Sequence, residues 1–212
     1  MKFIFWTNVY DGALGFTENN TSLQDLSEQY EMYFMSSGEK SREVIEKLYN
    51  GHIIDCSNDT AIKGKILFDM LKNRQDYDVL VRIDMDAIVF NLNKLTDIIE
   101  SNIVDKHAVL GNYKKFKTKK PNQFSGVRYV RGACQAATRS VIDRIDMVID
   151  KKAGFDIPYA MSFCKTNCEI IKCKLFELSN KYRGKYPVWH PKEKGEAKLN
   201  IFLKEISKYG KS

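Results

Sequence analysis

Long apolar runs are missing from this chain of 212 residues. No stretch approaches the roughly 20 apolar residues that a membrane span needs. The apolar start, residues 1–6, breaks at Thr7 and Asn8 and is too short for the core of a signal peptide. Internal repeats, low-complexity tracts and an obvious linker are also missing. With 43% hydrophobic and 29% charged residues the composition is that of a globular protein, so we expect one domain over residues 1–212.

Cysteine pairs with metal-binding spacing are missing too. The five cysteines are odd in number and never form a Cys-x-x-Cys pair. A zinc cluster built from Cys164, Cys168 and Cys173 lacks a convincing fourth ligand nearby. Reduced, mostly buried thiols are the better interpretation, and they indicate a cytoplasmic location.

Positive charge is in excess, with a formal net charge of +7. This raises the alternative of a non-catalytic, basic nucleic-acid-binding domain. Much of the excess is local, in a basic run at 114–120 and in the C-terminal segment. Such a run is usually a solvated loop, although an anionic partner or a lid over a phosphate-bearing ligand fits as well. No recognised nucleic-acid-binding motif is present, so we expect no nucleic-acid partner.

Strand and helix patterns alternate along the chain. This order predicts an α/β fold in which a mostly parallel central sheet is flanked by helices and ligands bind at the carboxyl ends of the strands. We expect strands at 2–6, 52–56, 77–83, 108–111 and 170–176, and helices at 22–35, 41–48, 62–71, 92–100, 140–149 and near the C-terminus. Two further segments, 127–130 and 132–135, follow the basic run.

The most informative segment is 77–90. An apolar run rich in β-branched residues ends in Asp84 and Asp86. On an extended backbone residues i and i+2 share a face, so the two carboxylates would repel each other unless a cation lies between them. Mg²⁺ or Mn²⁺ suits such oxygen ligands and leaves open positions for a diphosphate. The structural alternative is that these aspartates form a turn or cap a helix.

Arg82 precedes Asp84 by two residues and lies on the same face of the expected strand. A guanidinium in this place could form a structural ion pair with Asp84, or it could hold a phosphate. The residues alone leave both open.

A strand that ends in Asp-x-Asp also matches the nucleophile motif of haloacid-dehalogenase-like, Mg-dependent phosphohydrolases. In that alternative the Asp84/Asp86 pair would carry the chemistry. However, the motif normally lies near the start of the domain, whereas here a large part of the chain precedes it. The later acidic pair of that class is missing as well.

Several segments together resemble the metal-dependent glycosyltransferases of the GT-A fold, especially the β-1,3-galactosyltransferase and Fringe-like group. That group has a strand ending Lys-Thr-Asp-Asp-Asp-aliphatic, and residues 82–87 stand in its place. Residues 55–65 match its Asp-ended strand and lysine-bearing helix. Further counterparts are a Gly-rich segment at 131–134, a helix start at 138–141 and an acidic motif at 154–158.

The chain departs from this pattern in three places. Met85 replaces the middle aspartate, Gly132-Ala133 replaces a Gly-Gly pair, and the acidic doublet is reduced to Asp156 after Phe155. The missing membrane anchor suits a bacterial or viral member of the group.

The resemblance implies transfer of a hexose or deoxyhexose from a UDP-sugar to a hydroxyl of a glycan or glycoprotein acceptor. It implies Mn²⁺ (or Mg²⁺) as cofactor, bound by Asp84, Asp86 and His190, with Asp86 the more direct ligand. It further implies nucleotide contacts from Thr7, Asp55, Lys63, Arg82 and Asp84.

Asp156 is the expected catalytic carboxylate. In an inverting enzyme it would deprotonate the acceptor hydroxyl. In a retaining enzyme it would stabilise an oxocarbenium-like centre or act as nucleophile, and the residues do not decide between the two. Structural alternatives remain: His190 packed beside Trp189, Lys63 on a solvated helix face, and Thr7 or Asp156 as a cap.

Overall fold

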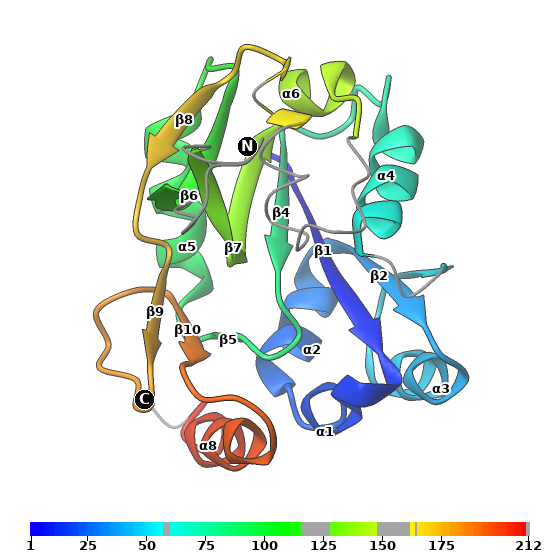
Figure 1. Cartoon of the computed structure of the whole chain (residues 1–212), viewed down its shortest axis with the longest axis vertical. Helices are drawn as coiled ribbons and strands as arrows, with labels where there is room; N and C mark the ends of the chain where they lie inside the picture. Colours follow the sequence, from blue (N-terminus) through cyan, green and yellow to red (C-terminus); the bar gives the residue numbers. More distant parts are fainter. Residues whose placement is uncertain (57–59, 116–127, 148–161, 164, 211–212) are drawn as a thin grey trace, which may run out of the picture.

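A seven-stranded sheet forms the centre of the protein (Figure 1). The computed structural model describes residues 1–56, 60–115, 128–147, 162–163 and 165–210. Strand order is β3-β2-β1-β4-β7-β6-β8, and of these strands β7 alone runs antiparallel to its neighbours. Their bounds are β1 Phe3–Tyr10, β2 Glu31–Ser37, β3 His52–Asp55, β4 Val79–Ile83, β6 Ala108–Lys115, β7 Arg128–Thr138 and β8 Glu169–Lys172.

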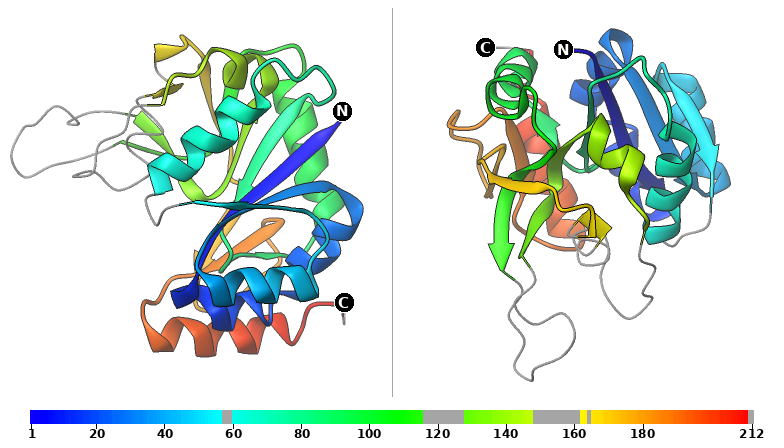
Figure 2. Two further views of the ribbon diagram at one scale, coloured as in Figure 1. Left: turned by 90° about the vertical axis from the view of Figure 1, so that its right-hand side faces the viewer. Right: turned by 90° about the horizontal axis from the view of Figure 1, so that it is seen from above.

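Helices cover both faces of this sheet (Figure 2). Alternate residues of β1 point to opposite faces, so Phe3 and Phe5 join one apolar core while Ile4 and Trp6 join the other. Helices α2 and α5 contribute to the first core, α4 and α6 to the second. The bounds are α1 Leu14–Thr17, α2 Thr21–Gln29, α3 Glu39–Leu48, α4 Thr60–Leu71, α5 Leu92–Ile103 and α6 Arg139–Arg144. The expected fold class is therefore confirmed.

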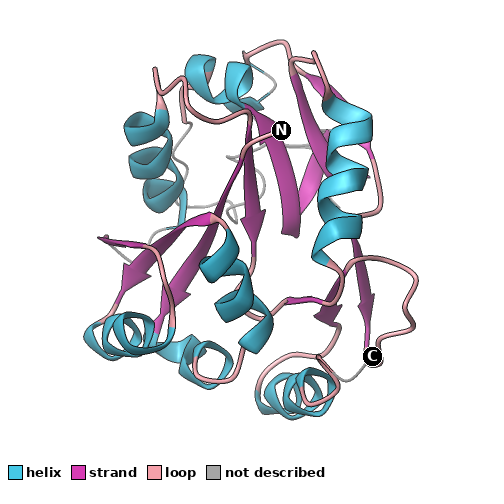
Figure 3. Cartoon of the chain, turned by 180° about the vertical axis from the view of Figure 1, so that it is seen from behind, coloured by secondary structure: helices cyan, strands magenta, loops and turns pink. Residues whose placement is uncertain are grey.

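A smaller sheet lies beyond the carboxyl end of β4 (Figures 1 and 3). Its strands are β5 (Ile88–Val89), β10 (Val188–Pro191) and β9 (Phe176–Ser179), in that order. Helix α8 (Glu196–Ile206) packs on it through a third apolar cluster that includes Trp189 and Phe202. The C-terminal segment thereby closes over the end of the central strand.

The expected helix at 22–35 is wrong in its second half. Helix α2 stops at Gln29 and β2 begins at Glu31, because Tyr30 turns the backbone to extended values, with φ −134° and ψ 152°. Met32 to Ser36 are all buried. A strand buried on both faces shows no alternation of apolar and polar residues, so its sequence resembles a continuation of the helix.

Other boundaries also differ from expectation. Residues 128–130 and 132–135 belong to one long strand, β7, and the candidate 170–176 divides into β8 and β9. Val127 falls outside the described residues. Helix α6 ends at Arg144, well before residue 149. No helix in the described ranges has the length and apolar character needed to cross a bilayer.

Candidate metal and nucleotide site

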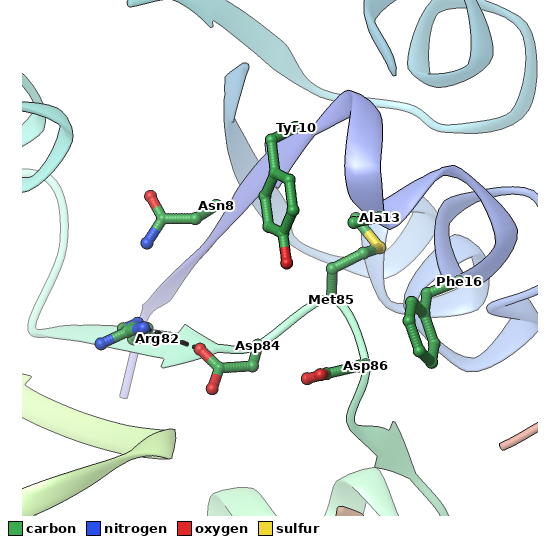
Figure 4. A pocket seen from close by; sticks show the side chains of 8 residues that line it. All are labelled: Asn8, Tyr10, Ala13, Phe16, Arg82, Asp84, Met85 and Asp86. Carbon is green, nitrogen blue, oxygen red and sulfur yellow. Dashed lines mark hydrogen bonds and ion pairs between the residues drawn. The ribbon is translucent and has the colours of Figure 1, made fainter. Parts of the chain in front are cut away.

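A cavity of about 180 Å³ opens where β1 and β4 end (Figure 4). Parallel sheets bind ligands at this edge because the polar residues that follow each strand converge there. The Asp84 and Asp86 carboxylates face this space, and Tyr10 extends toward it from the end of β1. The lining residues are Asn8, Tyr10, Ala13, Phe16, Arg82, Asp84, Met85 and Asp86.

A turn, not an extended strand, brings the two aspartates together. Strand β4 ends at Ile83, and the amide of Ala87 donates to the carbonyl of Asp84 at 2.9 Å. The expectation that Asp84 and Asp86 share a strand face is therefore wrong. The expectation that their carboxylates lie close together is correct. Asn20, the N-cap of α2, holds this turn, since its side-chain amide donates to the carbonyls of Met85 and Ala87.

Three side chains that could hold a metal ion meet at this site. One oxygen each from Asp84 and Asp86 and a ring nitrogen of His190 lie within 4.8 Å of one another. Within the described part of the chain this is the only such group of three His, Cys, Asp or Glu residues. Two carboxylates with one imidazole suit Mn²⁺, and Mg²⁺ accepts the oxygens more readily than the nitrogen. The donor set therefore fits the ion expected from the sequence.

His190 is oriented for this role. Its Nδ1 lies 2.7 Å from the carbonyl oxygen of Pro191, which can only accept, so Nδ1 carries a hydrogen. Nε2 lies 3.1 Å from Oδ1 of Asp86: it donates to that carboxylate when the ring is protonated, and it offers a lone pair to a metal ion when the ring is neutral. A backbone contact that fixes the tautomer in this way is common for ligating histidines.

Two basic side chains already neutralise the aspartates. Arg82 donates to Asp84 at 2.8 Å, and the Lys198 ammonium is paired with Asp86. Burial by itself would raise the pKa of Asp86, but its hydrogen bond to His190 and the charges of His190 and Lys198 hold that pKa well below its ordinary value. The Asp86 carboxylate is thus ionised, as a ligand of a divalent cation must be.

Lys198, Asn8 and Tyr10 were missed from the sequence. Lys198 lies in the closing helix α8, and nothing in the neighbouring sequence separates it from the other lysines of the C-terminal segment. Asn8 could have been found, since it directly follows Thr7 at the end of the first expected strand. Its side-chain nitrogen and oxygen are both buried without a hydrogen-bond partner. Buried polar groups are normally hydrogen-bonded, so this arrangement indicates that a bound ligand supplies the partner.

Thr7 and Lys63 are buried away from the cavity lining. Thr7 points to the opposite face of β1 from Asn8, because neighbouring strand residues alternate. Lys63 is 1% exposed and ties two strand ends together, donating to the carbonyl of Val9 at 2.9 Å and to Ser37 at 2.8 Å. Burial lowers the pKa of Lys63.

The remaining predicted residues lie elsewhere. Asp55 ends β3 and pairs with Arg42, outside the cavity lining. Asp156 falls outside the described residues. Cys56, Cys134, Cys168 and Cys173 are free thiols, and Cys164 also falls outside the described residues.

Comparison with known proteins finds matches among structures alone. No protein-family model matches the sequence, and no curated protein matches it. The galactosyltransferase LgtC, solved with donor and acceptor sugar analogs, aligns over 98% of this chain and 96% of its own, with a TM-score of 0.63 and 11% identity. The mannosyltransferase PcManGT from Pyrobaculum calidifontis, solved with GDP-Man and Mn²⁺, aligns over 82% of this chain and 55% of its own, with a TM-score of 0.58 and 12% identity.

The chain has a GT-A fold. A 4-diphosphocytidyl-2C-methyl-D-erythritol synthase from Anaerococcus prevotii also aligns over 97% of this chain and 96% of its own, with a TM-score of 0.57 and 10% identity. Enzymes with different products thus share this GT-A-like architecture, so the site and not the fold must indicate the reaction. The haloacid-dehalogenase alternative is not supported by these matches.

Proposed function

We propose that this GT-A protein is a metal-dependent glycosyltransferase. It uses a UDP-sugar and transfers the hexose or deoxyhexose to a hydroxyl of a glycan or glycoprotein. The observation that carries the proposal is the meeting of Asp84, Asp86 and His190 at the carboxyl edge of the sheet. This donor set fits Mn²⁺ or Mg²⁺ beside a cavity open to a ligand.

Charge balance in the site supports a diphosphate ligand. The Asp84 and Asp86 carboxylates are matched by the Arg82 and Lys198 cations. With a divalent ion bound, the site would carry a net charge of +2. A nucleoside diphosphate sugar carries two negative charges and would neutralise it. A site with this net charge attracts such a dianion.

Asp84, Asp86 and His190 would hold the ion, which when bound neutralises charge on the departing nucleoside diphosphate. Asn8 supplies one amide donor and one amide acceptor to the bound nucleotide or sugar, since both groups lack partners in the free protein. Tyr10 is 51% exposed at the rim and offers a ring face to the base or ribose. Thr7, Asp55 and Lys63 remain predicted nucleotide contacts, and Asp156 remains the predicted catalytic carboxylate.

Thermal-shift measurements with UDP-, GDP-, CDP- and ADP-sugars test the donor assignment, because a ligand that binds only the folded state raises the melting temperature. We expect a shift with a UDP-sugar that depends on Mn²⁺ or Mg²⁺. Release of UDP in the presence of an acceptor then reports transfer.

Asp86→Asn is the decisive variant. Asp97→Asn is its matched control, because Asp97 is an exposed aspartate on α5 with no role in the proposed site. We expect the Asp86 variant to lose the metal-dependent shift and the control to keep it. Unchanged UDP affinity with Mn²⁺ in Asp86→Asn would remove the metal assignment.

A further inference from the structure

Net charge is distributed very unevenly along this chain. Residues 172–212 contain eleven Lys or Arg and four Asp or Glu, whereas residues 1–171 contain 23 of each. Residues 1–171 are therefore neutral overall, because acidic residues offset the basic run at 114–120, and residues 172–212 carry a net charge of +7. This is the segment that forms β9, β10 and α8.

The fold gathers part of this charge at one point. Strands β9 and β10 are parallel, with Ser179 opposite Pro191, so both end at the same edge of the small sheet. Lys181 follows the first strand, and Lys192 and Lys194 follow the second. The side chain of Asn180 donates to Glu193 at 2.8 Å and ties the two segments together.

Lys181, Lys192 and Lys194, here called the lysine cluster, are all exposed. None of them forms an ion pair with a carboxylate in the described parts of the chain. Glu193 lies among them and is engaged by Asn180. Three exposed ammonium groups without a carboxylate partner, on two segments that a side-chain hydrogen bond joins, favour a ligand that carries several negative charges.

The lysine cluster adjoins the metal ligands. Lys192 and Lys194 follow His190 by two and four residues, and Lys198 then reaches Asp86 from α8. The cluster therefore begins at the end of the strand that carries His190. An acceptor held there lies on the chain segment that also supplies a candidate metal ligand, which would help to position its hydroxyl for transfer.

We propose that the lysine cluster binds the acceptor, and that this acceptor is an anionic glycan bearing carboxylate, phosphate or sulfate groups. The proposal rests on the glycosyltransferase function above and names its substrate class. A bilayer surface fits less well, because Leu203 is the only large hydrophobic side chain exposed among the described residues 172–210. Base stacking by nucleic acid also fits less well, since Tyr182 is already stacked on Phe90 with ring centroids 3.9 Å apart.

Binding of a fluorescent dextran sulfate oligosaccharide, with unsulfated dextran as the neutral counterpart, tests the cluster directly. The variant Lys181→Glu/Lys192→Glu/Lys194→Glu should bind the sulfated chain about tenfold or more weakly. The control Lys40→Glu/Lys47→Glu/Lys106→Glu changes net charge equally at exposed lysines of the neutral part, and should lose less than about twofold. Binding by the wild type should weaken steeply with salt.

Equal losses in the two triple variants would overturn the proposal, because the interaction would then follow total charge and not the cluster. Tighter binding to duplex DNA, or to phosphatidylglycerol vesicles, than to dextran sulfate would also overturn it. Metal-dependent UDP-sugar binding should persist in the cluster variant. If the wild type showed no metal-dependent UDP-sugar binding, that result would contradict the glycosyltransferase function. The dextran sulfate result would still decide whether the cluster binds anionic glycans.

Discussion

Asn20 fixes the backbone on both sides of Asp86. Its side-chain nitrogen donates to the carbonyls of Met85 and Ala87, each at 2.8 Å, while its oxygen accepts from the amide of Leu23 at the start of α2. Asn20 is fully buried. One side chain thus joins the N-terminus of a helix to the turn that carries the proposed metal ligand Asp86.

Asn20→Ala should therefore affect both stability and metal binding. Loss of these buried hydrogen bonds, at about 1 kcal/mol each, predicts a decrease of about 2–4 kcal/mol in the free energy of unfolding. We also expect weaker Mn²⁺ binding, because the turn is no longer held. Urea denaturation and metal titration followed by electron paramagnetic resonance measure the two effects.

Asn20→Asp provides the comparison for that variant. It keeps the oxygen that caps α2 but loses both donors to the turn, so its metal affinity should fall as in Asn20→Ala while the cap survives. Normal Mn²⁺ affinity in both variants would show that the turn holds its shape without Asn20.

Lys198→Met should increase the affinity for Mn²⁺ alone. The ammonium of Lys198 is paired with Asp86, so a divalent ion must displace it or bind beside a like charge. We expect a gain of about tenfold, or about 1.4 kcal/mol, in the absence of nucleotide. Lys204→Met, on an exposed part of the same helix, should leave the affinity unchanged.

Asn8→Ala should separate ligand binding from stability. The side chain makes no hydrogen bond in the free protein, so its removal breaks no hydrogen bond of the folded state. The free energy of unfolding should therefore change little. UDP-sugar affinity should fall about tenfold if the amide contacts the ligand, which calorimetry would reveal. A large loss of stability with unchanged affinity would assign Asn8 a purely structural role.

Arg74→Met should destabilise the protein at neutral pH and much less in acid. The hydrogen bond from Arg74 to Glu31, at 2.7 Å, holds the pKa of that carboxyl below its ordinary value of 4.5. A depressed carboxyl pKa contributes stability above 4.5, and this contribution is lost as pH falls through the lower folded value. We expect a cost of about 1 kcal/mol at pH 7, since both side chains are partly exposed. Urea denaturation at several pH values should show the two proteins converging in acid.

The alternation of strands and helices, and with it the fold class, followed from the sequence. So did the segment ending in Asp84 and Asp86, because an apolar run before two acidic residues is a local pattern. The same local reasoning failed at β2, whose residues 32–36 are buried on both faces and so carry no strand periodicity. It also placed the two aspartates on a strand, where the structure has a turn.

Sequence alone determined that this chain has an α/β fold with acidic residues at the end of a central strand. The periodicity of a strand or helix, and the polar residues that follow it, are patterns of neighbouring residues. Only the tertiary structure decided which distant groups meet them. Lys198 is paired with Asp86, and Asn20 holds its turn, across large separations in the chain. Such contacts depend on how α2 and α8 pack, and packing geometry leaves no short-range pattern in the residues that it brings together.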